Sequence, residues 1–182
     1  MKTRSKPEGL MLSGVVLIVL SILLPSLWAV RIHGRIRAVR QDLLGLADAL
    51  ARFQVEYGVW PTRRTCGYGD CRFGDGSPNR EVMNALRAVD GSGNEQNVVN
   101  PNRYVFLSPP PRAGGASGLD GDGEYRDPWG KPYQVLLDTD LNGECKAEST
   151  IRSSSTGGGV LIWSCGPDRK SDTADDIFPM GR

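Results

Sequence analysis

The end of the chain contains a crowded acidic stretch, "GPDRKSDTADDI". Like charges this close repel each other unless a cation lies among them. Calcium prefers oxygen ligands and accepts them from carboxylates, backbone carbonyls and water. The residues alone therefore leave two interpretations open, a solvated acidic loop and a cation site. The aspartates in question are Asp168, Asp172, Asp175 and Asp176.

A second acidic stretch, "DTDLNGE", begins at Asp138 and matches the opening of an EF-hand loop, D-x-D-x-N-G. That loop requires a glutamate at its twelfth position, where this sequence has Ser149. The run before it is typical of a strand rather than a helix. The pattern therefore favours a β-turn at Asn142 and Gly143. A second calcium site on Asp138, Asp140 and Asn142 stays open.

The composition argues against nucleic acid as a partner, because 22 basic and 21 acidic residues give a net charge of only +1. His33 is the single histidine, and no base, nucleophile or substrate motif accompanies the acidic loops. We therefore expect neither an enzyme nor a small-molecule binding protein. The 23 glycines and 12 prolines predict a body rich in loops.

An uncharged run extends over residues 10–30, and as a helix it would be about 31 Å long, the thickness of a bilayer's hydrocarbon core. A cleaved signal peptide is the alternative, but Trp28, Arg31 and His33 follow where small residues are expected. The run therefore predicts an uncleaved transmembrane anchor, preceded by a short cytoplasmic segment, residues 1–9.

An amphipathic helix is predicted over residues 31–58, continuing the anchor without a break. Gly58 and Pro61 provide the signals that end it. Its apolar residues recur at steps of three and four, so they form one stripe that we expect to pack on the body of the protein. These residues are Ile32, Ile36, Val39, Leu43, Leu46, Leu50, Phe53 and Tyr57.

The four cysteines all follow the anchor, and an even number favours disulfides in an oxidising compartment. The spacing in "CGYGDC" closes a small loop between Cys66 and Cys71, which leaves Cys145 to pair with Cys165. A zinc site is the alternative, but its second pair of cysteines would lie close together in the sequence. Disulfides place the N-terminus in the cytoplasm and the body outside it.

The remaining residues, 59–182, predict one globular domain. A short helix is indicated at "NREVMNALRAV". Three runs are typical of strands, "PYQVLLDTD", "CKAESTIR" and "GGVLIWSC". Short connections favour antiparallel pairing. The predicted fold class is α+β, with a long N-terminal helix packed on a small antiparallel sheet.

Several stretches of the chain, in order, resemble the major pseudopilin of type II secretion systems, a type IV pilin-like protein. They are "LADALARFQVEYGVWPT", "NPNRYVFL", "DPWGKPYQVLL" and "IWSCGPDRKSDTADDI". The resemblance implies a structural subunit for protein secretion across the outer membrane. It also implies a single-pass inner-membrane protein with a periplasmic domain, whose partners are sister subunits and the inner-membrane secretion machinery.

The resemblance also implies a ligand set for calcium in the C-terminal loop. In the family, aspartates spaced as Asp168, Asp175 and Asp176 are here bind the ion, together with carbonyls near Cys165. Asp172 stands where the family requires no carboxylate. We expect it to be solvated beside the two basic residues that precede it, Arg169 and Lys170.

At the N-terminus, Glu8 stands 17 residues before Pro25, similar to the spacing between the family's glutamate and helix proline. This implies a role for Glu8 in subunit assembly. However, Thr3 stands where the family has a glycine before its cleavage point. The alternative function is therefore a non-assembling single-pass envelope protein that uses a calcium-binding, pseudopilin-like domain as a binding module.

Overall fold

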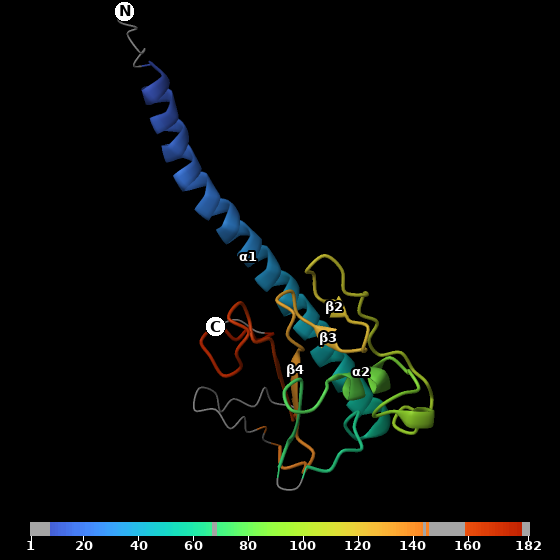
Figure 1. Ribbon diagram of the computed structural model, residues 1–182. Coiled ribbons are helices and arrows are strands. Elements are labelled where there is room, and N and C mark those ends of the chain that lie inside the picture. The colour runs from blue at the N-terminus through green and yellow to red at the C-terminus, as the bar shows by residue number, and fades with distance from the viewer. Residues whose placement is uncertain (1–7, 67–68, 144, 146–158, 180–182) are drawn as a thin grey trace, which may run out of the picture. The chain divides into compact units, whose positions relative to one another are not determined.

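The computed structural model describes residues 8–66, 69–143, 145 and 159–179 of the chain (Figure 1), and for residues 8–20 and 22–29 it describes the backbone alone. The chain divides into two compact units, Met1–Arg35 and Ile36–Arg182. The second unit contains the sheets and both acidic stretches.

The first element is a helix of 50 residues, α1 (Glu8–Tyr57), which covers both predicted helical segments. It ends where the sequence predicts. Gly58 adopts a positive φ of 71°, and its N–H donates to the carbonyl of Gln54 at 2.8 Å. A glycine tolerates this conformation without the steric cost that a side chain would add.

The predicted single-pass inner-membrane localisation, with a cytoplasmic N-terminus and a periplasmic domain, requires a membrane-spanning helix. Among the residues that the structure describes, no helix is both long enough and apolar enough to cross a membrane. From Val30 onward α1 carries arginines and aspartates, whose transfer into hydrocarbon is costly. On this finding the predicted localisation is wrong. The predicted anchor, residues 10–30, is helical, and most of its side chains lie outside the described residues.

The apolar stripe of α1 forms the core of the second unit from Val39 onward, as predicted. Its side chains pack with α2, β1, β4 and β5 in one cluster. Burying such aliphatic and aromatic side chains is the main favourable contribution to folding. The fully buried members of the stripe are Val39, Leu43, Leu46, Leu50 and Phe53.

A three-stranded antiparallel sheet has the order β1 (Cys71–Phe73), β4 (Gln134–Leu137), β5 (Val160–Trp163). Cys71 pairs with Leu137, and Leu137 pairs with Val160. All of β4 is buried because both of its faces are covered. Val135 and Leu137 face the main core, and Leu136 packs with Leu161 and Trp163 on the other side.

The sequence predicted two of these strands and missed the third. The runs at β4 and β5 are confirmed, whereas β1 lies in a segment where no strand was predicted. The third predicted run, "CKAESTIR", lies outside the described residues except for Cys145. A second, two-stranded sheet pairs β2 (Gly118–Leu119) with β3 (Tyr125–Arg126).

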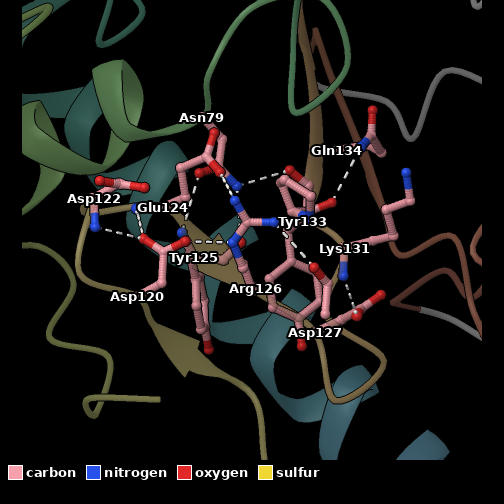
Figure 2. Close-up of polar contacts among 12 residues, drawn as sticks. Asn79, Asp120, Asp122, Glu124, Tyr125, Arg126, Asp127, Lys131, Tyr133 and Gln134 are labelled. Atoms are coloured by element: carbon pink, nitrogen blue, oxygen red, sulfur yellow. Dashed lines mark hydrogen bonds and ion pairs between the residues drawn. The ribbon is translucent and has the colours of Figure 1, made fainter. Parts of the chain in front are cut away.

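The predicted short helix is present as α2 (Arg80–Leu86), and a 3-10 helix, η1 (Glu95–Asn97), follows it. The buried Asn79 side chain connects α2 to the sheets, because it donates to the carbonyls of Tyr125 and Tyr133 at 2.9 Å each (Figure 2). The described fold is α+β, as predicted, with one long helix and a small antiparallel sheet.

Candidate functional site

The C-terminal acidic stretch forms a loop that is closed at its base. Ser164 and Ile177 exchange two backbone hydrogen bonds, of 3.0 and 2.9 Å. Gly166 lies so close to the other side of the loop that an added Cβ would stand 2.1 Å from the Asp175 carbonyl oxygen. Because Gly166 also has a φ of 66°, no other residue fits this position without a shift of the backbone.

The four aspartates of the loop have different surroundings, and only Asp176 turns inward. Asp168 and Asp175 are exposed, and Asp168 accepts from the backbone N–H of Lys170 at 2.9 Å. One oxygen of Asp176, Oδ2, accepts from the N–H groups of Asp172 and Thr173 at 2.9 and 3.3 Å. Its other oxygen, Oδ1, is buried and has no hydrogen-bond partner. Burial raises the pKa of Asp176 to about 6.

The predicted calcium ligands are therefore only partly in place. Asp176 offers a buried carboxylate oxygen that a cation would satisfy. The carboxylates of Asp168, Asp175 and Asp176 do not come together as a group of three among the described residues. The structure shows no calcium-binding arrangement in this loop.

An arginine from β1 supplies positive charge to the loop. The Arg72 guanidinium donates to the Ser171 hydroxyl at 2.7 Å and lies 3.7 Å from the Asp172 carboxylate. It also lies over the Trp163 ring, 5.0 Å from its centre, and the indole N–H donates to Ser171 at 3.1 Å. Asp172 is half-buried beside Arg72, so the prediction that it is solvated beside its sequence neighbours is wrong.

Sequence reasoning missed Arg72 because Arg72 and Ser171 are 99 residues apart in the sequence. Only antiparallel pairing through β4 brings their strands together. A weak local signal exists, because Cys71 and Phe73 are buried on either side of the partly exposed Arg72, the alternation of a half-buried strand.

A buried carboxylate, Asp127, fixes the loop's first end to the turn before β4. Its Oδ1 accepts from the N–H groups of Trp129 and Lys131 at 2.9 Å each, and its Oδ2 accepts from the Ser164 hydroxyl at 2.7 Å. The same hydroxyl oxygen accepts from the N–H of Gly166 at 3.1 Å. Burial raises the pKa of Asp127 above its usual range.

The second acidic stretch lies in a different cluster. One oxygen of Asp138, one of Asp140 and one of Asp70 lie within 4.8 Å of one another. Asp138 is buried and accepts from the N–H groups of Asn142 and Gly143 at 3.1 and 2.8 Å, so it braces a turn. A hydrogen bond with Asp138 is the main cause that lowers the pKa of Asp140.

This arrangement favours the predicted turn over an EF-hand, because β4 rather than a helix precedes it. Positive φ angles occur at Leu141 and Gly143, whereas the prediction placed them at Asn142 and Gly143. The sequence did not predict Asp70 as a member of the cluster. It enters from the loop before β1, and nothing in the local sequence indicates that position.

A third acidic group surrounds an arginine. In Figure 2 the Arg126 guanidinium lies against the carboxylates of Asp120 and Glu124, and it also donates to the Gly130 carbonyl at 3.0 Å. Asp120 further accepts from the N–H groups of Asp122 and Glu124 at 2.9 Å each. The group is therefore a folded polar turn in which one guanidinium pairs with two carboxylates.

The cysteines confirm one predicted disulfide and not the other. Cys66 and Cys71 are bonded, with an S–S distance of 2.08 Å. Cys145 and Cys165 are free and buried, so the second predicted pair does not form in the structure. Cys145 packs with Leu136, Leu161 and Trp163. Burial raises the pKa of the Cys145 thiol to about 12 and that of Cys165 to about 11.

The predicted assembly residue Glu8 is the first residue of α1, and its side chain lies outside the described residues. Its role stays a prediction. Comparisons with known proteins found no matching family model, no matching curated protein and no matching solved structure.

Proposed function

We propose that the chain is a pseudopilin-like structural subunit of a type II secretion machine or a related type IV filament machine, with a role in assembly rather than in catalysis. The observation that carries the proposal is the meeting of three stretches that resemble the family. The end of α1, the "DPWGKPYQVLL" segment and the C-terminal segment are far apart in the sequence and contact one another.

These contacts are specific. The end of α1 and the "DPWGKPYQVLL" segment share one core cluster, which includes Leu46, Phe53 and Tyr133. The Ser164 hydroxyl of the C-terminal segment donates to Asp127. β4 lies in one of the stretches and the second half of β5 in another, and the two strands pair along their whole lengths. The stretches that resemble the family therefore contribute to one common core. The partners that this proposal implies are sister subunits and the secretion machinery.

We further propose that calcium binds the C-terminal loop, with Asp176 as its buried ligand. The support is the Asp176 Oδ1 atom, which is buried and lacks a hydrogen-bond partner. Such an oxygen is costly to leave unsatisfied, and calcium accepts carboxylate oxygens of this kind. Asp168, Asp175 and the Cys165 carbonyl would complete the site. The ion would be structural, holding the loop against the sheet.

The function is tested by deleting the gene in the native cell and measuring the extracellular proteins by mass spectrometry. We expect a set of secreted proteins to be retained, and expression of the intact chain to restore their release. A cross-linking amino acid at Val105, which is 61% exposed, should also capture other subunits of the machine. Normal secretion in the deletion strain, without any captured subunit, would contradict the proposal.

A further inference from the structure

One face of α1 in the second unit is exposed although it contains large apolar side chains. Leu44 is 50% exposed and Val55 is 88% exposed. We call this face the exposed stripe. It consists of Arg37, Gln41, Leu44, Asp48, Ala51 and Val55, all of which are exposed.

The exposed stripe has the spacing of a helix-pairing surface. Its residues alternate in steps of four and three, so they lie along one side of the helix, opposite the buried side that forms the core. The same spacing places the contacting residues of paired helices in a single seam. The stripe also has one positive charge, Arg37, and one negative charge, Asp48, on either side of Leu44.

We propose that the exposed stripe binds the same stripe of a second copy of this chain, antiparallel, about a two-fold axis that passes between Asp42 and Leu43. In this register Arg37 lies opposite Asp48 of the second copy. The symmetry repeats that pair at the other end. Gln41 lies opposite Leu44, and the two Leu44 side chains meet across the axis.

The charges decide between the two orientations of such a pair. A parallel pair in register would place Arg37 against Arg37 and Asp48 against Asp48, and both contacts are repulsive. The antiparallel pair replaces them with two attractive contacts. A two-fold interface of this kind is closed, because each copy presents the same surface to the other.

Asp48 is available for this contact. It lies 2.9 Å from Arg52 in its own chain, but its side chain is 66% exposed. A carboxylate has two oxygens and can accept from two arginines. Exposed ion pairs add little affinity and mainly fix the register, so the apolar side chains must contribute most of the binding.

This inference goes beyond the proposed function and does not rest on it. A closed two-fold pair cannot extend into a filament, so it would be a state of the unassembled chain. The two experiments can therefore fail separately. A chain that does not dimerise would not contradict the proposed role in secretion, and normal secretion in the deletion strain would not contradict the dimer.

The test is sedimentation of the purified full chain over a range of concentrations at low salt. We expect a reversible dimer that weakens as salt is added. Arg37→Asp and Asp48→Arg should each raise the Kd for dimerisation at least about tenfold, because each turns two attractive contacts into repulsive ones. A mixture of the two variants should associate again, because every charged contact in the mixed pair is attractive.

Two controls separate this result from a loss of folding. Arg52→Gln removes the partner of Asp48 within the chain and should leave the dimer intact. Arg37→Asp and Asp48→Arg should melt near the temperature of the unchanged chain, because the substituted side chains are exposed. Arg52→Gln also loses a hydrogen bond to the Phe106 carbonyl, so it should stay folded but melt at a somewhat lower temperature. A chain that stays monomeric, or folded variants that do not associate better when mixed than alone, would overturn the proposal.

Discussion

Single residues fix the most important connections of this fold. Asp127 is fully buried, and its carboxylate accepts hydrogen bonds from two backbone N–H groups and from Ser164. A buried carboxylate is costly unless such donors surround it. Through Ser164 the same group holds Gly166, the first turn of the C-terminal loop. One side chain therefore connects the turn before β4 to the acidic loop.

Asp127→Ala should lower the free energy of unfolding by about 2–4 kcal/mol, because it leaves three donors without their acceptor. Asp127→Asn, which keeps the shape and one acceptor, should cost roughly 1 kcal/mol at neutral pH. Urea denaturation of the three proteins measures both values. Equal losses in the alanine and asparagine variants would contradict the role of the hydrogen bonds.

The raised pKa of Asp127 predicts that the stability of the fold depends on pH. Burial raises the pKa of Asp127 in the folded state above its usual value, so the folded state holds this proton more tightly than the unfolded state does. The stability that this group contributes is complete below the unfolded pKa, about 3.9, and is lost as the pH rises through the folded pKa. The difference in the free energy of unfolding between the unchanged chain and Asp127→Asn should therefore become smaller from pH 4 towards pH 7. A difference that increases over this pH range would contradict the raised pKa of Asp127.

At the scale of elements, α1 has two faces with different roles. One face supplies the core of the second unit, and the other is the exposed stripe. Leu46 is fully buried, whereas Leu44, two residues earlier in the same helix, is 50% exposed. The two leucines are chemically identical, so their difference in burial alone should decide what each contributes to stability.

Leu46→Ala should lower the free energy of unfolding by about 2–5 kcal/mol, through lost burial and the cavity that remains. Leu44→Ala should change it by less than about 0.5 kcal/mol when the chain is dilute. Thermal or urea denaturation checks both values. Similar losses at the two positions would mean that the helix does not pack on the sheet in the orientation described.

At the scale of the whole molecule, the acidic loop receives positive charge from two sources outside it, one observed and one proposed. Arg72 reaches the loop from β1 and lies near Asp172. Calcium is the proposed second source, near Asp176. The loop has four aspartates, and its own Arg169 and Lys170 together with Arg72 supply three positive charges, so its charge is only partly balanced without an ion.

Removal of calcium by a chelator should lower the melting temperature. Calcium at a hundred times its Kd stabilises the folded state by about 2.7 kcal/mol, which corresponds to roughly 5–10 °C for a chain of this size. Asp175→Ala and Asp176→Asn should abolish the difference between calcium and chelator. Asp140→Asn, in the second acidic cluster, is the matched control and should keep it.

Two results would contradict the calcium proposal. Identical melting curves in calcium and in chelator would mean that the folded chain does not bind the ion. A calcium effect that disappears in Asp140→Asn and survives in Asp176→Asn would move the site to the cluster of Asp70, Asp138 and Asp140.

The sequence by itself determined the features that depend on local pattern. The periodicity of α1 predicted its buried stripe, the apolar runs predicted β4 and β5, and the spacing in "CGYGDC" predicted the bond between Cys66 and Cys71. Each of these signals acts over a few residues, where the geometry of a helix, a strand or a small ring is nearly fixed.

Only the tertiary structure decided which distant residues meet. It brought Arg72 to Asp172 and Asp70 to Asp138, and it left Cys145 and Cys165 unbonded, because the fold rather than spacing in the sequence sets these neighbours. It also left Leu44 and Val55 exposed, and it turned Asp176 inward while Asp168 and Asp175 stayed in solvent. Residues of one type can thus lie in one short segment and still differ in burial, because burial depends on what the rest of the chain places around each of them.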